Sequence, residues 1–211
     1  MSPLQHNSPS AVASSQEFSS EERVQLLGLA HDSISSALQG REISLDPPTP
    51  HFAEPRGVFT SIYLRHDPPG EARHREDHRP NELRGCVGYI LPTCSVYRAV
   101  AETARAAAFD DNRFPPVAQE EVRRLEIELS ILSLARPIQP EEVEVGRHGL
   151  LISWHGQRGL LLPQVPVERA WDRTIFLEQA CRKAGLLPDA WQRGATIEAF
   201  TAEVFGDKSG Q

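Results

Sequence analysis

The hydrophobic pattern of the chain first becomes regular over residues 20–39, where apolar side chains recur at helical spacing. Ser19 and Glu22 stand three residues apart at the start of this stripe, as the two residues of a capping box do. Gly40 follows the stripe and can end a helix. We therefore predict a helix over residues 20–39 whose apolar stripe packs on a core.

Two further stretches have the helical period. Residues 96–108 carry many alanines, which suits close packing against a sheet, and Thr93 or Ser95 can cap this helix. A third helix is predicted from about residue 168 to residue 183, with Gly185 at its C-terminal end.

A period of two residues, or an excess of β-branched and aromatic residues, predicts six strands. They cover residues 57–64, 83–90, 125–133, 150–154, 159–162 and 196–205. Residues 125–133 alternate most regularly, which indicates a strand with one buried and one polar face. Hairpins with helices between them are typical of an α+β chain with a mainly antiparallel sheet.

The stretches without a periodic pattern define the expected boundaries. Residues 1–18 are rich in Ser, Gln, Ala and Pro, and we expect a disordered tail. Residues 65–81 are charged or turn-forming and predict a long exposed loop between two strands. The folded domain is expected over residues 19–207, and residues 208–211 are expected to fray.

The composition narrows the class of protein. Of 211 residues, 39% are hydrophobic and 24% are charged, which is a globular rather than a disordered composition. The net charge of −7 argues against a surface that neutralises nucleic-acid phosphates. There is no apolar run that could span a membrane and no secretory signal, and three cysteines are too few for a disulfide framework. We expect a cytoplasmic protein.

The most unusual strand is the one over residues 83–90, because it contains a thiol, a guanidinium and two glycines. Glycine is disfavoured in strands, so Gly85 and Gly88 indicate that another backbone or a ligand comes close there. If the strand alternates regularly, Arg84, Cys86 and Gly88 share one face. A cation on the same face as a cysteine can lower the pKa of its thiol.

The other motifs in the sequence do not identify a functional site. His74 and His78 would lie on one face of a helix and could share a metal ion, but no apolar face fixes such a helix, so we interpret the segment as a solvated charge run. Arg75 breaks the zinc pattern His-Glu-x-x-His. Gly-x-Gly-x-x-Gly and phosphate-loop patterns do not occur, so the sequence identifies neither a metal site nor a cofactor.

A series of segments, taken together, resembles the AMMECR domain family, also called protein A of the AmmeMemoRadiSam system. In this chain they are residues 57–60, 83–88, 106–114, 125–132, 146–150, 159–165, 171–172, 176–177, 181–186 and 204–205. Two of them read Leu-Arg-Gly-Cys-Val-Gly and Ala-Ala-Ala-Phe-Asp-Asp-Asn-Arg-Phe, and it is the ordered series that is specific. The loop over residues 66–80 is longer and more charged than the family pattern.

The resemblance implies a two-lobed α+β fold with a mainly antiparallel sheet, flanking helices and a cleft between the lobes, with residues 83–88 beside that cleft. It implies no settled molecular activity. The name of the system implies two partners, a Memo-type protein and a radical S-adenosylmethionine enzyme, and therefore a shared modification pathway. Whether the protein is an enzyme stays open, and its substrate and cofactor stay unknown.

Cys86 has three interpretations: a small buried hydrophobe, a reactive thiolate or covalent carrier, and a metal ligand. The last one lacks partners, because Cys94 is not at a close ligand spacing. His148 stands close to two glycines in a turn and is either a surface residue or a general acid/base at the cleft. Cys86 and His148 are the candidate catalytic residues.

Five residues are candidates for ligand binding: Arg84, Gly85, Gly88, Arg113 and Gln164. Arg84 can pair with a carboxylate across the sheet or bind an anionic ligand bidentately. Gln164 can face the cleft from a strand end, and Arg113 lies in a charged turn.

Three functional hypotheses fit these residues. An enzyme would use Cys86 and His148 on a small or peptide substrate. A non-catalytic binding or adaptor module would present a peptide or small molecule to partner proteins. In the third hypothesis the glycine-containing strand is only a packing solution.

Overall fold

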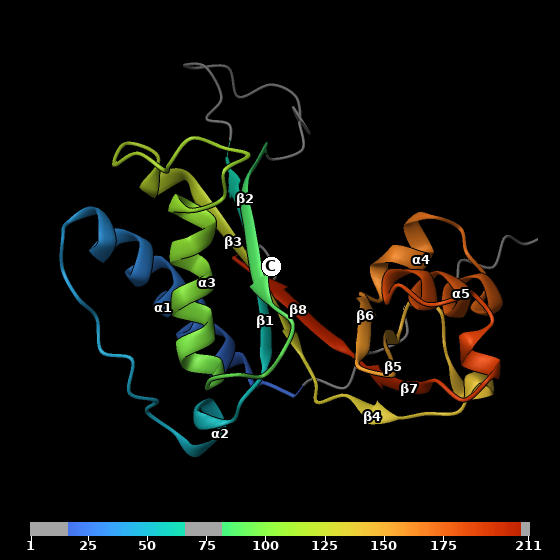
Figure 1. Cartoon of the computed structure of the whole chain (residues 1–211). Helices are drawn as coiled ribbons and strands as arrows, with labels where there is room; N and C mark the ends of the chain where they lie inside the picture. Colours follow the sequence, from blue (N-terminus) through green and yellow to red (C-terminus); the bar gives the residue numbers. More distant parts are fainter. Residues whose placement is uncertain (1–16, 66–81, 208–211) are drawn as a thin grey trace, which may run out of the picture.

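The structure is a computed structural model that describes residues 17–65 and 82–207 (Figure 1). Predictions for the first 16 residues, for residues 66–81 with His74 and His78, and for residues 208–211 lie outside the described residues. The described chain forms two lobes, each with its own hydrophobic core and its own antiparallel four-stranded sheet. The predicted α+β class is therefore confirmed.

The first lobe is a sheet with two long helices on one face (Figure 1). Its strands are β1 (Gly57–Leu64), β2 (Glu82–Tyr89), β3 (Leu125–Leu132) and β8 (Ala202–Gly206), in the order β2-β1-β3-β8. Its helices are α1 (Ser20–Leu38), α2 (Pro50–Ala53) and α3 (Val96–Phe109). The capping box at Ser19 and Glu22 is formed, and Ser95 caps α3, as predicted.

The core of the first lobe lies between this sheet and the two long helices. On β1, Val58 and Ile62 are fully buried, and Thr60 between them bonds Thr103 of α3 through its hydroxyl at 2.7 Å. That hydrogen bond compensates for burying two hydroxyl groups. Because side chains alternate along a strand, the neighbours of these residues on β1 point to the opposite face, away from the helices.

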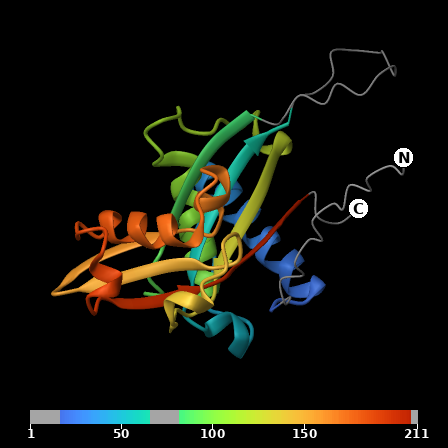
Figure 2. The same cartoon turned by 90° about the vertical axis from the view of Figure 1, so that its right-hand side faces the viewer.

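The second lobe has one helix-covered face as well. Its strands are β4 (Arg136–Pro137), β5 (Gly149–Trp154), β6 (Gln157–Leu161) and β7 (Thr196–Phe200), in the order β4-β7-β5-β6. Its helices are α4 (Gln164–Glu168) and α5 (Arg173–Lys183), and α5 packs on β5 and β6 (Figure 2). Short 3₁₀ turns cover Val122–Arg124, Pro140–Glu142 and Ala190–Gln192.

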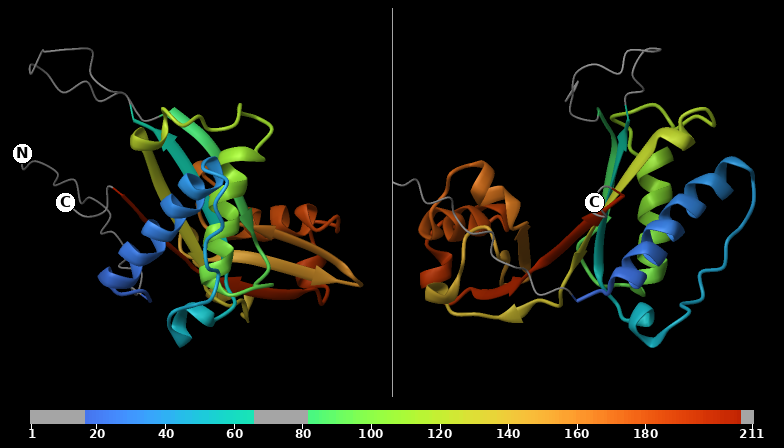
Figure 3. Two further views of the ribbon diagram at one scale, coloured as in Figure 1. Left: turned by 90° about the vertical axis from the view of Figure 1, so that its left-hand side faces the viewer. Right: turned by 180° about the vertical axis from the view of Figure 1, so that it is seen from behind.

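The predicted strand over residues 196–205 is wrong as one element, because it is two strands in two different sheets. The chain leaves β7 at Phe200 and enters β8 at Ala202, as the long red ribbon in the right half of Figure 3 shows. Thr201 between them donates its N–H to Ser133 Oγ at 2.9 Å, and the Ser133 N–H donates to the Thr201 carbonyl at 2.9 Å. Two crossings between the lobes thus lie side by side.

The predicted helix over residues 168–183 is also wrong at its start. The chain forms α4, turns at Ala170 with a positive φ of 52°, and begins α5 only after Asp172. The Asp172 carboxylate accepts the Ile175 N–H at 2.8 Å, which is an N-cap. The short helix α4, helix α2 and strand β4 are not in the prediction.

Two further observations complete the fold. Phe18, which the sequence places in the tail, is 1% exposed and packs in the first core. Among the helices described, none combines the length and hydrophobicity needed to cross a membrane.

Candidate functional site

Cys86 lies on β2, an end strand of the first sheet, with a half-buried side chain. Its partner across the strand pair is Ser61, whose Oγ donates a hydrogen bond to Cys86 Sγ at 3.3 Å. Ser61 alternates with the buried residues Thr60 and Ile62, so the thiol and the hydroxyl lie on the sheet face that the helices leave uncovered.

The outer edge of β2 at Cys86 is closed by two side chains from the turn after α3. The Cys86 N–H donates to Asp111 Oδ2 at 2.9 Å, and Arg113 Nη2 donates to the Cys86 carbonyl at 3.2 Å. Arg113 also binds Asp111 at 2.6 Å, which joins the two into one clasp. The hydrogen bonds from Arg113 and from the Cys86 N–H hold the pKa of Asp111 well below its usual range.

The predicted shared face of Arg84 and Cys86 assumed regular alternation, and the register between β1 and β2 shifts at this point. Arg84 is the extra residue of this bulge, and bulges redirect side chains. Its guanidinium donates to both carboxylate oxygens of Glu121, at 2.9 and 3.0 Å, and to the carbonyl of Pro115. The same contact lowers the pKa of Glu121. Of the two interpretations of Arg84, the structure contains the carboxylate pair, while the cation next to Cys86 is Arg113.

The two glycines have different neighbours. A Cβ on Gly85 would overlap the carbonyl oxygen of Ala107, so α3 approaches the backbone of β2 there. A Cβ on Gly88 would overlap the ring of Phe59, which lies over that glycine. The predicted approach of another backbone is therefore confirmed at Gly85, whereas at Gly88 the nearest group is a side-chain ring.

His148 and Gln164 belong to the second lobe. His148 is 5% exposed, and its Nδ1 accepts the N–H of Glu144 at 3.1 Å. Burial lowers the pKa of His148, which favours a neutral imidazole. The charges acting on it come from Glu144, Arg147, Arg136 and Glu142. Gln164, the first residue of α4, is exposed. Among the described contacts, none joins His148 to Cys86.

A groove of about 360 Å³ lies where the two lobes meet. The first lobe contributes the segments at 90–92 and 132–135, and the second contributes residues of β5, β6 and β7. Three apolar residues of the groove are unusually exposed: Ile90 at 40%, Leu91 at 45% and Leu134 at 54%. None of the seven predicted site residues lines it. The resemblance implied a cleft between the lobes, but the sequence named none of the residues that line this groove, because they come from distant segments and carry no motif.

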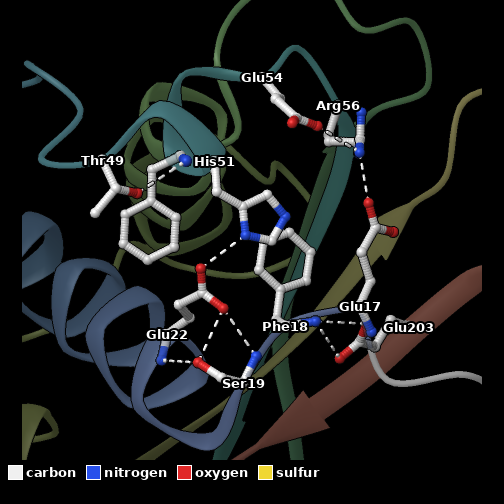
Figure 4. Close-up of polar contacts among 10 residues, drawn as sticks. Glu17, Phe18, Ser19, Glu22, Thr49, His51, Glu54, Arg56 and Glu203 are labelled. Carbon is white, nitrogen blue, oxygen red and sulfur yellow. Dashed lines mark hydrogen bonds and ion pairs between the residues drawn. The ribbon is translucent and has the colours of Figure 1, made fainter.

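One group of side chains has the composition of a metal site. Glu17, His51 and Glu54 place ligand atoms within 4.8 Å of one another (Figure 4). Arg56, however, binds both glutamates through Nη2, at 2.5 and 2.7 Å. Its guanidinium already pairs with both carboxylates, so the cluster joins the chain ahead of α1 to α2 and β1. Phe18 stacks on His51 at 4.5 Å between ring centroids.

Comparisons with known proteins agree on one family. The family model described as AMMECR1 matches residues 27–205. Protein MK0488 of Methanopyrus kandleri is 37% identical over 198 residues, which cover 89% of both chains. Protein TK0174 of Thermococcus kodakarensis is 39% identical over 193 residues, covering 87% of this chain and 89% of that protein.

A solved structure shares the fold. The crystal structure of the uncharacterized protein PH0010 from Pyrococcus horikoshii matches with a TM-score of 0.65 and 38% identity, covering 87% of this chain and 90% of that chain.

Proposed function

Because the chain belongs to the AMMECR1 family, we propose that it is a binding module whose inter-lobe groove holds a peptide or small molecule and presents it to partner proteins. The observation that carries the proposal is the exposure of Ile90, Leu91 and Leu134 around one groove. Apolar side chains left exposed around a concave surface are typical of binding sites. The separation of His148 from Cys86 favours this function over catalysis by the pair.

The partners belong to the same proposal. A Memo-type protein and a radical S-adenosylmethionine enzyme would act with this chain in a modification pathway. The groove would hold the substrate or product of that pathway, and the uncovered sheet face with Cys86 and Ser61 would lie next to it.

Native mass spectrometry tests the groove. We expect the protein purified from its own cells to retain a molecule that adds to the sequence mass. Leu134→Asp places a charge among the apolar groove residues, and that variant should retain none. Leu187→Asp is the matched control, because Leu187 is 64% exposed and does not line the groove. If the wild-type protein and Leu134→Asp are both measured at the mass of the sequence alone, the proposal is refuted.

The contact between Ser61 and Cys86 favours a second function, in which the thiol carries a group covalently. The test is the rate of alkylation by iodoacetamide, in which the thiolate displaces iodide. Cys86 should react faster than Cys94 and Cys181, since burial raises the pKa of both of those thiols. Ser61→Ala should slow the reaction at Cys86 alone, because it removes the donor to Sγ. An unreactive Cys86 in the folded protein would exclude this function.

A further inference from the structure

We propose that the groove binds an extended peptide, which adds an antiparallel strand to the free edge of β6. This inference rests on the proposed binding function and names the class of ligand. A strand added to a sheet edge gains main-chain hydrogen bonds, and alternate side chains give specificity.

Strand β6 is the end strand of the second sheet, and the hydrogen-bond pattern shows which backbone groups it leaves free. The Ile138 N–H donates to the Ile197 carbonyl at 3.1 Å, so the backbone of Ile197 is turned toward β4. Its partner Ile152 on β5 is therefore turned toward β6 and pairs with Gly159. Pairs alternate in an antiparallel ladder, so the N–H and C=O of the flanking residues point outward.

Those flanking residues are Arg158 and Leu160, and both line the groove. Within the described part of the chain, neither residue makes a backbone hydrogen bond on that side. The contrast is with β2, where Asp111 and Arg113 bind the outward groups of Cys86. Arg158 and Leu160 line the same groove as Ile90, Leu91 and Leu134 of the first lobe. The free edge therefore adjoins the apolar groove residues of the first lobe.

Charge and register define the peptide. Arg158 and Leu160 are two residues apart and share a face, so two alternate peptide side chains lie beside them. Arg158 is exposed and has no described ion pair, and Glu198 of the groove lies two strands away on β7. The occupant is thus a segment of a partner protein with an apolar residue opposite Leu160 and an acidic residue opposite Arg158. In an antiparallel arrangement the apolar residue comes first.

The probe is a fluorescein-labelled, acetylated peptide amide of sequence Thr-Leu-Thr-Glu-Thr, and binding is measured by fluorescence anisotropy. We expect saturable binding to the wild-type protein. Methylating the backbone nitrogens of Leu and Glu removes both donors to β6, and at about 1 kcal/mol for each hydrogen bond this should weaken binding by at least about tenfold.

Leu160→Pro provides the complementary change in the protein. It removes the outward N–H of Leu160 and leaves the hydrogen bonds between β5 and β6 in place. We expect a loss of about fivefold for this one hydrogen bond, whereas Leu160→Val keeps the N–H and should bind like wild type. Thermal unfolding confirms that both variants fold. Arg158→Glu should invert the preference between the Glu peptide and its Lys counterpart.

The outcomes separate the two proposals. Weaker peptide binding after methylation of the peptide and after Leu160→Pro supports strand addition. Equal binding of the methylated peptide, or no binding of either peptide, overturns strand addition. The mass of the protein purified from cells tests the groove independently. If the protein retains a ligand but does not bind the peptide, the proposed binding function stands and only the proposal of a peptide ligand is rejected.

Discussion

At the scale of single residues, the glycines of β2 are explained by what touches them. The helix backbone at Ala107 occupies the space where a side chain on Gly85 would lie, and the Phe59 ring does the same at Gly88. Gly28 in α1 differs, because nothing lies within 4 Å of its Cβ position. Gly85 is therefore required by packing, while Gly28 only weakens its helix.

Gly85→Ala and Gly28→Ala should change stability in opposite directions. Gly85→Ala forces β2 and α3 apart and should lower the free energy of unfolding by about 1–3 kcal/mol. Gly28→Ala should raise it by about 1 kcal/mol, because alanine favours the helix interior. Urea denaturation measures both. Equal effects of the two substitutions would contradict the packing that we describe at Gly85.

His148 should make stability depend on pH. Burial lowers its pKa in the folded state, so the unfolded chain binds a proton more readily. Stability should therefore fall as pH drops below about 6.5, the ordinary histidine value, and be fully regained above it. His148→Gln removes this titration, and the difference in unfolding free energy between the two proteins should change between about pH 5 and 7. If the difference in unfolding free energy does not change with pH, His148 is protonated as easily in the folded protein as in the unfolded chain.

At the scale of elements, the errors of the sequence prediction occur where two elements look like one. The predicted helix over residues 168–183 runs from the last residue of α4 through α5, but Asp172 begins a new helix there. The alternation over residues 196–205 is real, but Thr201 divides it between two sheets. Periodicity reports which face of an element is buried and does not report which partner buries it.

Removing the N-cap of α5 should destabilise the protein. Asp172→Ala leaves the N–H of Ile175 without its acceptor and should cost about 1 kcal/mol. Asp172→Asn keeps an acceptor oxygen and should cost much less. Thermal unfolding measures the difference between the two. If α5 began at residue 168 instead, both substitutions would fall inside the helix and this difference would disappear.

At the scale of the whole molecule, two cores are joined by two adjacent crossings. Residues 132–136 carry the chain from the first sheet to the second, and residues 200–202 carry it back. Ser133 and Thr201 bind each other across these crossings with two hydrogen bonds. The groove lies beside them, so the same contacts that hold the lobes together also fix its walls.

Ser133→Ala should loosen this connection. It removes the acceptor of the Thr201 N–H and should cost about 1 kcal/mol. The amide of Thr201 should exchange faster with deuterium, while amides in the middle of β1 should be unaffected. Ser130→Ala is the control, because Ser130 lies on β3, three residues before Ser133, is half-buried and has no described side-chain hydrogen bond. Unchanged exchange at Thr201 would show that other contacts fix the crossing.

The sequence alone determined most elements, because helix and strand periods and capping residues are local. The capping box of α1, strand β1 and helix α3 follow from neighbouring residues, and the ordered series of motifs identifies the family. The candidate site was only partly accessible: Cys86 and Arg113 were named, and the structure joins them through the clasp with Asp111. The catalytic use of Cys86 and His148 stays a prediction.

Only the tertiary structure decided the bulge that turns Arg84 to Glu121, the division at Thr201 and the groove around Leu134. Each depends on groups that are distant in sequence. A bulge depends on the partner strand, and a groove depends on how two lobes are placed. Local patterns contain no information about either, because the free energies that fix them come from contacts made after the elements have formed.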